Sequence, residues 1–183
     1  SVPTSKFHGI TLGSCLTIGG IVILLYSFTT SGHLANADVL VQLALVLHVM
    51  TVSLWIGSLY PLLRFSQTHE PSSIQQIMHT FGKVATWIVS VLLLCGLSLA
   101  WLLLGGVSDL VTTNYGKGLG VKIVLVVTLL LIAARNKLRL TPAMLQPGIG
   151  ARLSLAIRIE ILIALLILLT TAIITVIIGT EAI

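Results

Sequence analysis

Charged side chains are scarce in this sequence. Its 183 residues include ten Lys and Arg and five Asp and Glu, so charged residues make up 8% of the chain while hydrophobic residues make up 56%. That is too little polar surface to cover a soluble globule of this size, so the composition excludes a soluble globular domain. The sequence therefore predicts an all-α membrane protein, a polytopic helical bundle embedded in the lipid bilayer.

Cysteine is also rare, and its placement excludes a disulfide framework. Cys15 and Cys95 lie in apolar segments far apart in the sequence, with no CxxC spacing, so we interpret both as packing residues. Acidic residues are too few to balance the basic ones, and the net charge is +5. Because the basic residues gather where the apolar segments end, this charge indicates membrane topology and not a nucleic-acid partner.

Five apolar segments are each long enough to cross a bilayer at about 1.5 Å per residue. They cover residues 10–28, 39–63, 84–104, 117–134 and 153–178 of what we expect to be a single membrane domain over residues 1–183. Before the third span, apolar residues at i, i+3, i+4 and i+7 predict an interfacial amphipathic helix over residues 72–83, which runs into that span.

Turn-forming residues separate these spans. We expect a loop over residues 105–116, and we expect the two prolines of the 135–152 segment to stop any continuous helix there. Pro61 should also weaken the last turn of the second span.

Basic residues set the expected orientation. With five spans, one side of the membrane carries seven of them, and the other side carries Lys117 with Asp38, Asp109 and Glu181. The seven are Lys6, Arg64, Lys83, Arg135, Lys137, Arg139 and Arg152. The positive-inside rule then predicts a cytoplasmic N-terminus and a C-terminus on the outer, periplasmic side.

Tryptophan marks the two ends of the third span. Trp87, Leu94 and Trp101 are spaced two helical turns apart and therefore share one face. Trp at both ends of a span is typical of the aromatic belts at membrane interfaces, which we favour over a cofactor-stacking role.

A histidine, His48, stands in the second span, which contains no charged residue. It lies roughly halfway along the expected helix, and Trp55, seven positions on, shares its face. An ionisable ring at that depth indicates a metal, haem or proton site, while a simple hydrogen bond to a neighbouring helix remains the alternative. Thr51 and Ser53, or hydroxyl groups on the third or fifth span, are candidate acceptors for the ring N–H that binds no ligand.

Lys122 and Glu160 are two further candidates, as proton or charge stations inside the fourth and fifth spans. For Lys122 the alternative is that its long side chain reaches the membrane interface. Glu160 is the one carboxylate well inside a span, and its alternative role is a structural ion pair with a basic residue near Arg158.

Several ordered motifs resemble the CopD family of bacterial copper-resistance membrane proteins. The resemblance extends over roughly residues 31–178, most of the chain, through the motifs SGHL (31–34), HVMTVSLWIGSLYPLL (48–63), YGKGLGVKIVLV (115–126), ARNKLRLTP (134–142) and IRIEILIALLILLTTA (157–172). The resemblance implies a multi-pass inner-membrane protein that takes part in copper transport or resistance, often beside a periplasmic partner of the CopC type. It implies a transporter-like protein, while an enzyme stays open under the alternative given below.

Copper would be handled through histidine if this resemblance holds. The chain lacks the Met-rich clusters of other copper sites, since Met50, Met78 and Met144 are its only methionines. Imidazole binds copper readily, so His33 and His48 are the candidate metal ligands. His48 lies about 15 Å deeper than the outer-surface His33 if the segment from Asp38 is helical, so the two would be successive stations for a copper ion.

A second resemblance gives an alternative. The run from His48 to Pro61 also resembles the membrane haem proteins of the HemJ type, which implies haem b as the cofactor with His48 as an axial ligand. A third hypothesis is a non-catalytic subunit of a larger membrane complex.

Overall fold

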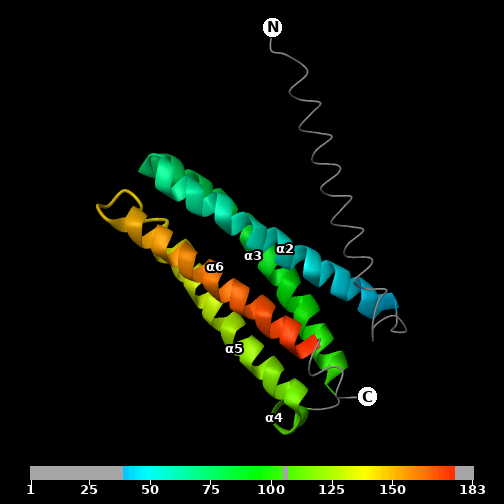
Figure 1. Ribbon diagram of the computed structural model, residues 1–183. Helices are drawn as coiled ribbons and strands as arrows, with labels where there is room; N and C mark the ends of the chain where they lie inside the picture. The colour runs from blue at the N-terminus through cyan, green and yellow to red at the C-terminus, as the bar shows by residue number, and fades with distance from the viewer. Residues whose placement is uncertain (1–38, 105–106, 176–183) are drawn as a thin grey trace.

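Four long helices lie side by side in the computed structural model, which describes residues 39–104 and 107–175. α2 (Val39–Thr68) and α3 (Pro71–Leu103) form one antiparallel hairpin, and α5 (Asn114–Arg135) and α6 (Ile149–Ile173) form another (Figure 1). All four are long and apolar enough to cross a membrane. The all-α membrane bundle is thereby confirmed, while the span expected over residues 10–28 lies outside the described residues.

α2 is longer than the span predicted over residues 39–63, because it continues through Pro61 to Thr68. Leu59, Leu62 and Ser66 lie buried on either side of this proline. Packing of that inward face keeps the last turns helical although proline removes one backbone hydrogen bond. His48 therefore lies in the first third of the helix, and not near its middle as expected.

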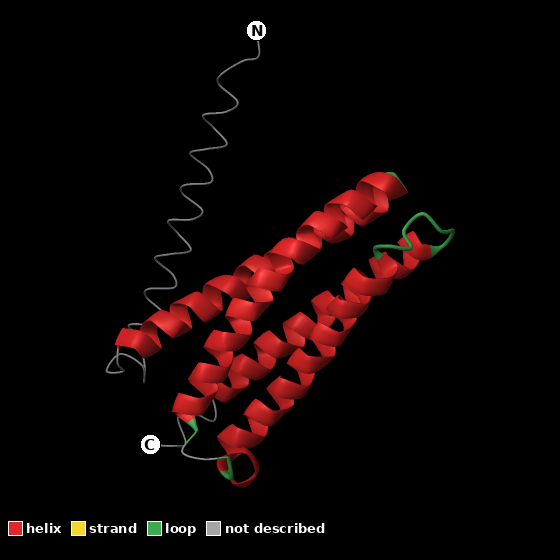
Figure 2. Ribbon diagram, turned by 180° about the vertical axis from the view of Figure 1, so that it is seen from behind, coloured by secondary structure: helices red, strands yellow, loops and turns green. Residues whose placement is uncertain are grey.

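α3 is one helix from Pro71 to Leu103 (Figure 2). Pro71 occupies the first turn, where a missing N–H is tolerated. Residues 72–83 are the first part of this helix, and Ile74 and Met78 supply its buried positions there. The Gln75 side-chain amide donates to the carbonyls of Thr141 and Pro142, which ties the start of α3 to the connection between α5 and α6.

The connection expected over residues 105–116 is partly helical. α4 (Asp109–Thr112) is a single turn, and Thr113 caps the start of α5 by accepting a hydrogen bond from the Gly116 N–H. A Cβ on Gly116 would lie 1.9 Å from the backbone oxygen of Asp109, so only glycine allows α4 and α5 to approach this closely.

α5 passes directly into the π-helix η1 (Asn136–Leu140), so the chain stays helical beyond residue 134, where the fourth span was expected to end. The helix ends before Pro142, and a connection through Gly148 leads into α6. Gly148 has a φ of 80°, a conformation that residues with a side chain rarely adopt. α6 thus begins at Ile149, earlier than the expected residue 153.

Apolar side chains fill both the core and the outer surface of the bundle. The core gathers residues from all four long helices, among them Trp55, Leu129, Leu153 and Ala164. Outward, the α3 stripe of Trp87, Leu94 and Trp101 is 78%, 69% and 77% exposed. A soluble protein rarely exposes so much continuous apolar surface, whereas lipid covers it in a membrane.

Candidate functional site

His48 lies at the contact between α2 and α3, half-buried in apolar surroundings. Its Nδ1 lies 3.3 Å from the backbone oxygen of Leu92 on α3. A carbonyl oxygen can only accept, so Nδ1 carries the proton in this hydrogen bond. The neutral ring then keeps a free lone pair on Nε2, the nitrogen that could bind a ligand.

Gly96 makes room for this ring. A Cβ on Gly96 would lie 3.0 Å from the Cε1 of His48 and 3.3 Å from its Nδ1, closer than ordinary van der Waals contact. Gly96 and Leu92 are one helical turn apart on α3. The glycine therefore admits the ring to the position where the Leu92 carbonyl binds it.

The hydroxyl groups expected to hold the His48 ring do not do so. Thr51 donates to the Leu47 and His48 backbone oxygens, and Ser53 donates to the Val49 backbone oxygen. Short hydroxyl side chains in a helix readily bond to the preceding turn of their own helix. The partner on the neighbouring helix is a main-chain carbonyl, which no residue-type pattern reveals.

Lys122 is half-buried on α5, with its charge within electrostatic range of His48. Their helices, α2 and α5, both pack against α6. His33 lies outside the described residues, so its relation to His48 stays a prediction.

Glu160 is buried on α6, with 4% of its surface exposed. It lies about 16 Å along this helix from its start at Ile149. The Asn136 side-chain amide donates a hydrogen bond to its Oε1. Arg158 is exposed, so the partner of the carboxyl group is a neutral amide and not the cation considered from the sequence.

Asn136 is the first residue of η1 and is itself 8% exposed. Its backbone oxygen accepts two hydrogen bonds from Thr141, one from the N–H and one from the hydroxyl, each 2.9 Å long. These bonds fix the main chain at Asn136. Its side-chain Oδ1 is buried and has no hydrogen-bond partner, which is uncommon for a buried polar atom.

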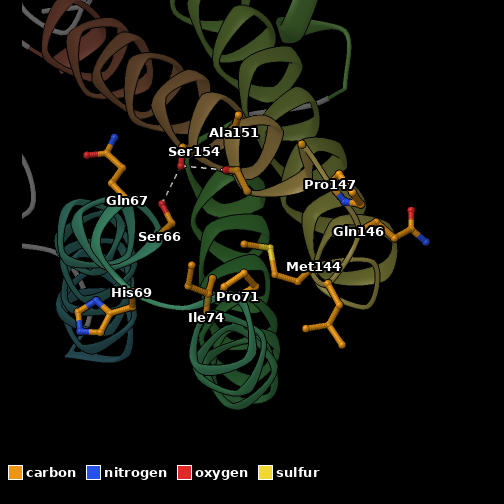
Figure 3. A pocket seen from close by; sticks show the side chains of 13 residues that line it. Ser66, Gln67, His69, Pro71, Ile74, Met144, Gln146, Pro147, Ala151 and Ser154 are labelled. Atoms are coloured by element: carbon orange, nitrogen blue, oxygen red, sulfur yellow. Dashed lines mark hydrogen bonds between the residues drawn. The ribbon is translucent and has the colours of Figure 1, made fainter.

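Two surface hollows lie at the end of the bundle where α2 meets α3. The larger, about 500 Å³, has Ser66, His69, Met144 and Ser154 among its lining residues, and Ser66 and Ser154 are hydrogen-bonded across it at 3.0 Å (Figure 3). The smaller, about 420 Å³, includes His79 and Lys137. Neither is lined by His48 or Glu160, so the two candidate groups lie within the helix packing.

Metal ligands are sparse in the part of the chain that the structure describes. Nowhere in residues 39–104 and 107–175 do three His, Cys, Asp or Glu side chains come together to hold one metal ion. Closed metal centres usually have about four such ligands.

Sequence reasoning missed Asn136 and Gly96 as neighbours of the candidate groups. The basic residues around Asn136 suggested a loop, although Asn136 continues the helical spacing of Leu129, Ala133 and Leu140, which face the core. That spacing could have placed the amide inside the bundle. No comparable signal distinguished Gly96.

Comparison with known protein families gives one match, to the family described as CopD, Copper resistance protein D. The match covers residues 75–174, more than half of the chain, and contains Gly96, Lys122, Asn136 and Glu160 but not His48. Neither the curated proteins nor the solved structures give a match. The chain therefore belongs to the CopD family, and it is a multi-pass membrane protein of copper resistance.

Proposed function

We propose that this protein moves copper ions within the membrane and that His48 is a station on their path. The observation that carries the proposal is the fixed ring of His48. Leu92 holds the protonated Nδ1 and Gly96 provides the space, so Nε2 is left as a ligand in an apolar bundle. Membership of the CopD family indicates copper as the ion, and the geometry around the ring supports His48 as its ligand.

Copper is the cargo here and not a resident cofactor. One imidazole nitrogen binds copper well enough to attract the ion, while a transport site must also release it. A lone, oriented histidine suits that requirement better than a cluster of three or four ligands would. His33, expected at the outer surface, would be the preceding station.

Lys122 would oppose a cation at His48, because its ammonium carries the same sign of charge as the ion. Within this proposal it acts as a charge station that weakens copper binding and favours release. The arrangement is consistent with an exchangeable site.

The orientation follows from the basic residues. Those of the described part gather toward the end of the bundle where α2 meets α3 and where η1 is followed by α6, which we assign to the cytoplasmic side of a bacterial inner membrane. His48 then lies in the outer half, where a CopC-type periplasmic protein could deliver copper. Reporter fusions at Asn36 and Gln146 should report opposite sides, and a same-side result would contradict this topology.

The test replaces His48 with Leu, which is apolar, similar in bulk and favoured in membrane helices. Purified protein should then lose bound Cu(I), and cells should lose the copper phenotype at matched protein level. His79→Leu is the matched control, since His79 is an exposed histidine on α3, and it should behave like the unchanged protein.

Two results would contradict the proposal. Full copper binding together with an unchanged phenotype in His48→Leu would reduce His48 to a packing residue. A haem absorption band that disappears in His48→Leu would assign the ring to haem b instead.

A further inference from the structure

The buried pair of Asn136 and Glu160 leaves one of its hydrogen-bonding atoms unsatisfied. The amide nitrogen of Asn136 donates to Glu160 Oε1, while Asn136 Oδ1 has no partner. Both residues are more than nine-tenths buried. A buried acceptor without a partner, next to a carboxyl group, indicates that it accepts a hydrogen bond in another protonation state of the pair.

The two side chains have matching chemistry for two protonation states. An ionised carboxylate only accepts hydrogen bonds, so it needs the amide NH₂ group as donor. A protonated carboxyl group has one O–H donor, and the same amide offers Oδ1 as its acceptor. Rotation of the Asn136 amide about its terminal side-chain bond exchanges the positions of its NH₂ donor and its Oδ1 acceptor. The hydrogen bonds from Thr141 keep the Asn136 backbone in place meanwhile.

Positively charged side chains on the helices that pack against α6 do not replace Asn136 as the partner of the Glu160 carboxyl group. α2, α5 and η1 pack against α6, and most titratable side chains on these elements and on α6 itself are exposed. The remaining His48, Tyr115 and Lys122 are half-buried, and the hydrogen-bond donor that the structure gives to the carboxyl group is the Asn136 amide. The exposed ones are Tyr60, Arg64, Lys117, Arg135, Lys137, Arg139, Arg152 and Arg158.

We propose that Glu160 and Asn136 form a buried proton-binding site, in which the Asn136 amide turns to match the charge of the carboxyl group. In the binding step a proton from water forms an O–H bond at one carboxylate oxygen, and the side chain changes from charge −1 to neutral. The Asn136 amide then accepts this O–H through Oδ1. The reverse step returns the proton to water.

A proton fits this site better than a metal ion does. The pair offers only carboxyl and amide oxygens, which are hard ligands that copper does not favour. Mg²⁺ and Ca²⁺ need about six or more oxygen ligands, more than two side chains can supply. A proton requires one acceptor and one hydrogen-bond partner, and both are present.

Infrared spectroscopy of the full chain in lipid, without copper, tests the proposal independently of copper transport. The chain has five acidic side chains, so the C=O stretch of a buried carboxylic acid can be assigned. We expect a band that appears as the pH is lowered and vanishes as it is raised. It should be absent in Glu160→Gln and present in the matched control Glu70→Gln, which changes an exposed carboxylate.

A second measurement follows the partner without altering it. The chain contains three asparagines, Asn36, Asn114 and Asn136, so NMR of asparagine-labelled protein can resolve the Asn136 amide. Its signals should shift with pH at the same midpoint as the Glu160 band, and this shift should be absent in Glu160→Gln. No titrating Glu160 band, or an Asn136 signal that ignores the titration, would overturn the proposal and leave a structural hydrogen bond.

Discussion

His48 and Glu160 are both ionisable groups inside an apolar bundle, but their partners differ in kind. His48 is held by a main-chain carbonyl, that of Leu92, which belongs to the rigid helix α3. Glu160 is held by the side chain of Asn136, which has both a donor and an acceptor. A backbone partner fixes one hydrogen-bonding state, whereas an amide partner can serve two.

Because their partners differ, His48 and Glu160 suit different functions. A ring whose protonated nitrogen cannot change has its other nitrogen directed permanently at a ligand, which suits metal binding. A carboxyl group whose partner can rotate adapts to gain or loss of charge, which suits a proton.

The largest effect is expected at Asn136. Asn136→Leu removes the donor that the buried carboxyl group uses, so the free energy of unfolding should fall by about 2 kcal/mol. Adding Glu160→Met replaces both partners by apolar groups and should restore most of that loss. Unfolding of the single and double variants by denaturing detergent measures both values.

The stability of the double variant, Asn136→Leu with Glu160→Met, can also contradict the pairing of the two side chains. If it is less stable than Asn136→Leu alone, the two side chains do not act as a pair. The contrast between the hydrogen-bond partners of His48 and Glu160 would then no longer hold.

A smaller effect is expected at Gly96. Gly96→Ala puts a methyl group 3.0 Å from the His48 ring, so the ring must move from Leu92 and stability should fall by about 1 kcal/mol. Gly57→Ala on α2 is the control, because a Cβ there meets nothing within 4 Å. It should be neutral or stabilising, since alanine favours a helix.

Copper binding sharpens the Gly96 test. Gly96→Ala should weaken Cu(I) binding and Gly57→Ala should not. Unchanged binding in Gly96→Ala would mean that the position of the ring against α3 does not matter for the ligand.

The smallest effect is expected at Arg158, two residues from Glu160. Arg158 is exposed, so Arg158→Gln should change stability by less than about 0.5 kcal/mol and should leave the Glu160 infrared band in place. A loss as large as that of Asn136→Leu would indicate an ion pair between Arg158 and Glu160 and would remove Asn136 as the main partner.

Much of the fold could be predicted from the sequence, because long apolar runs determine which segments span a membrane. The spans expected over residues 39–63, 84–104, 117–134 and 153–178 correspond to α2, α3, α5 and α6. Their ends were less predictable. Packing extends α2 past Pro61, and η1 carries the α5 helix into a basic segment that resembles a loop.

The site was predictable only in part. Ionisable residues in apolar segments identified His48, Lys122 and Glu160, since such residues are rare and stand out. Their partners could not be found in this way. The Leu92 carbonyl has no sequence signature, and the space at Gly96 exists only once α2 lies against α3.

We expect His48 to bind copper through Nε2, the nitrogen that the hydrogen bond to the Leu92 carbonyl leaves free. Nitrogen NMR of histidine-labelled protein, titrated with Cu(I) and assigned with His48→Leu, tests it most directly. The Nε2 signal of His48 should move on copper binding while Nδ1 keeps its proton. A ring that does not respond to bound copper, or one that loses the Nδ1 proton instead, would contradict it.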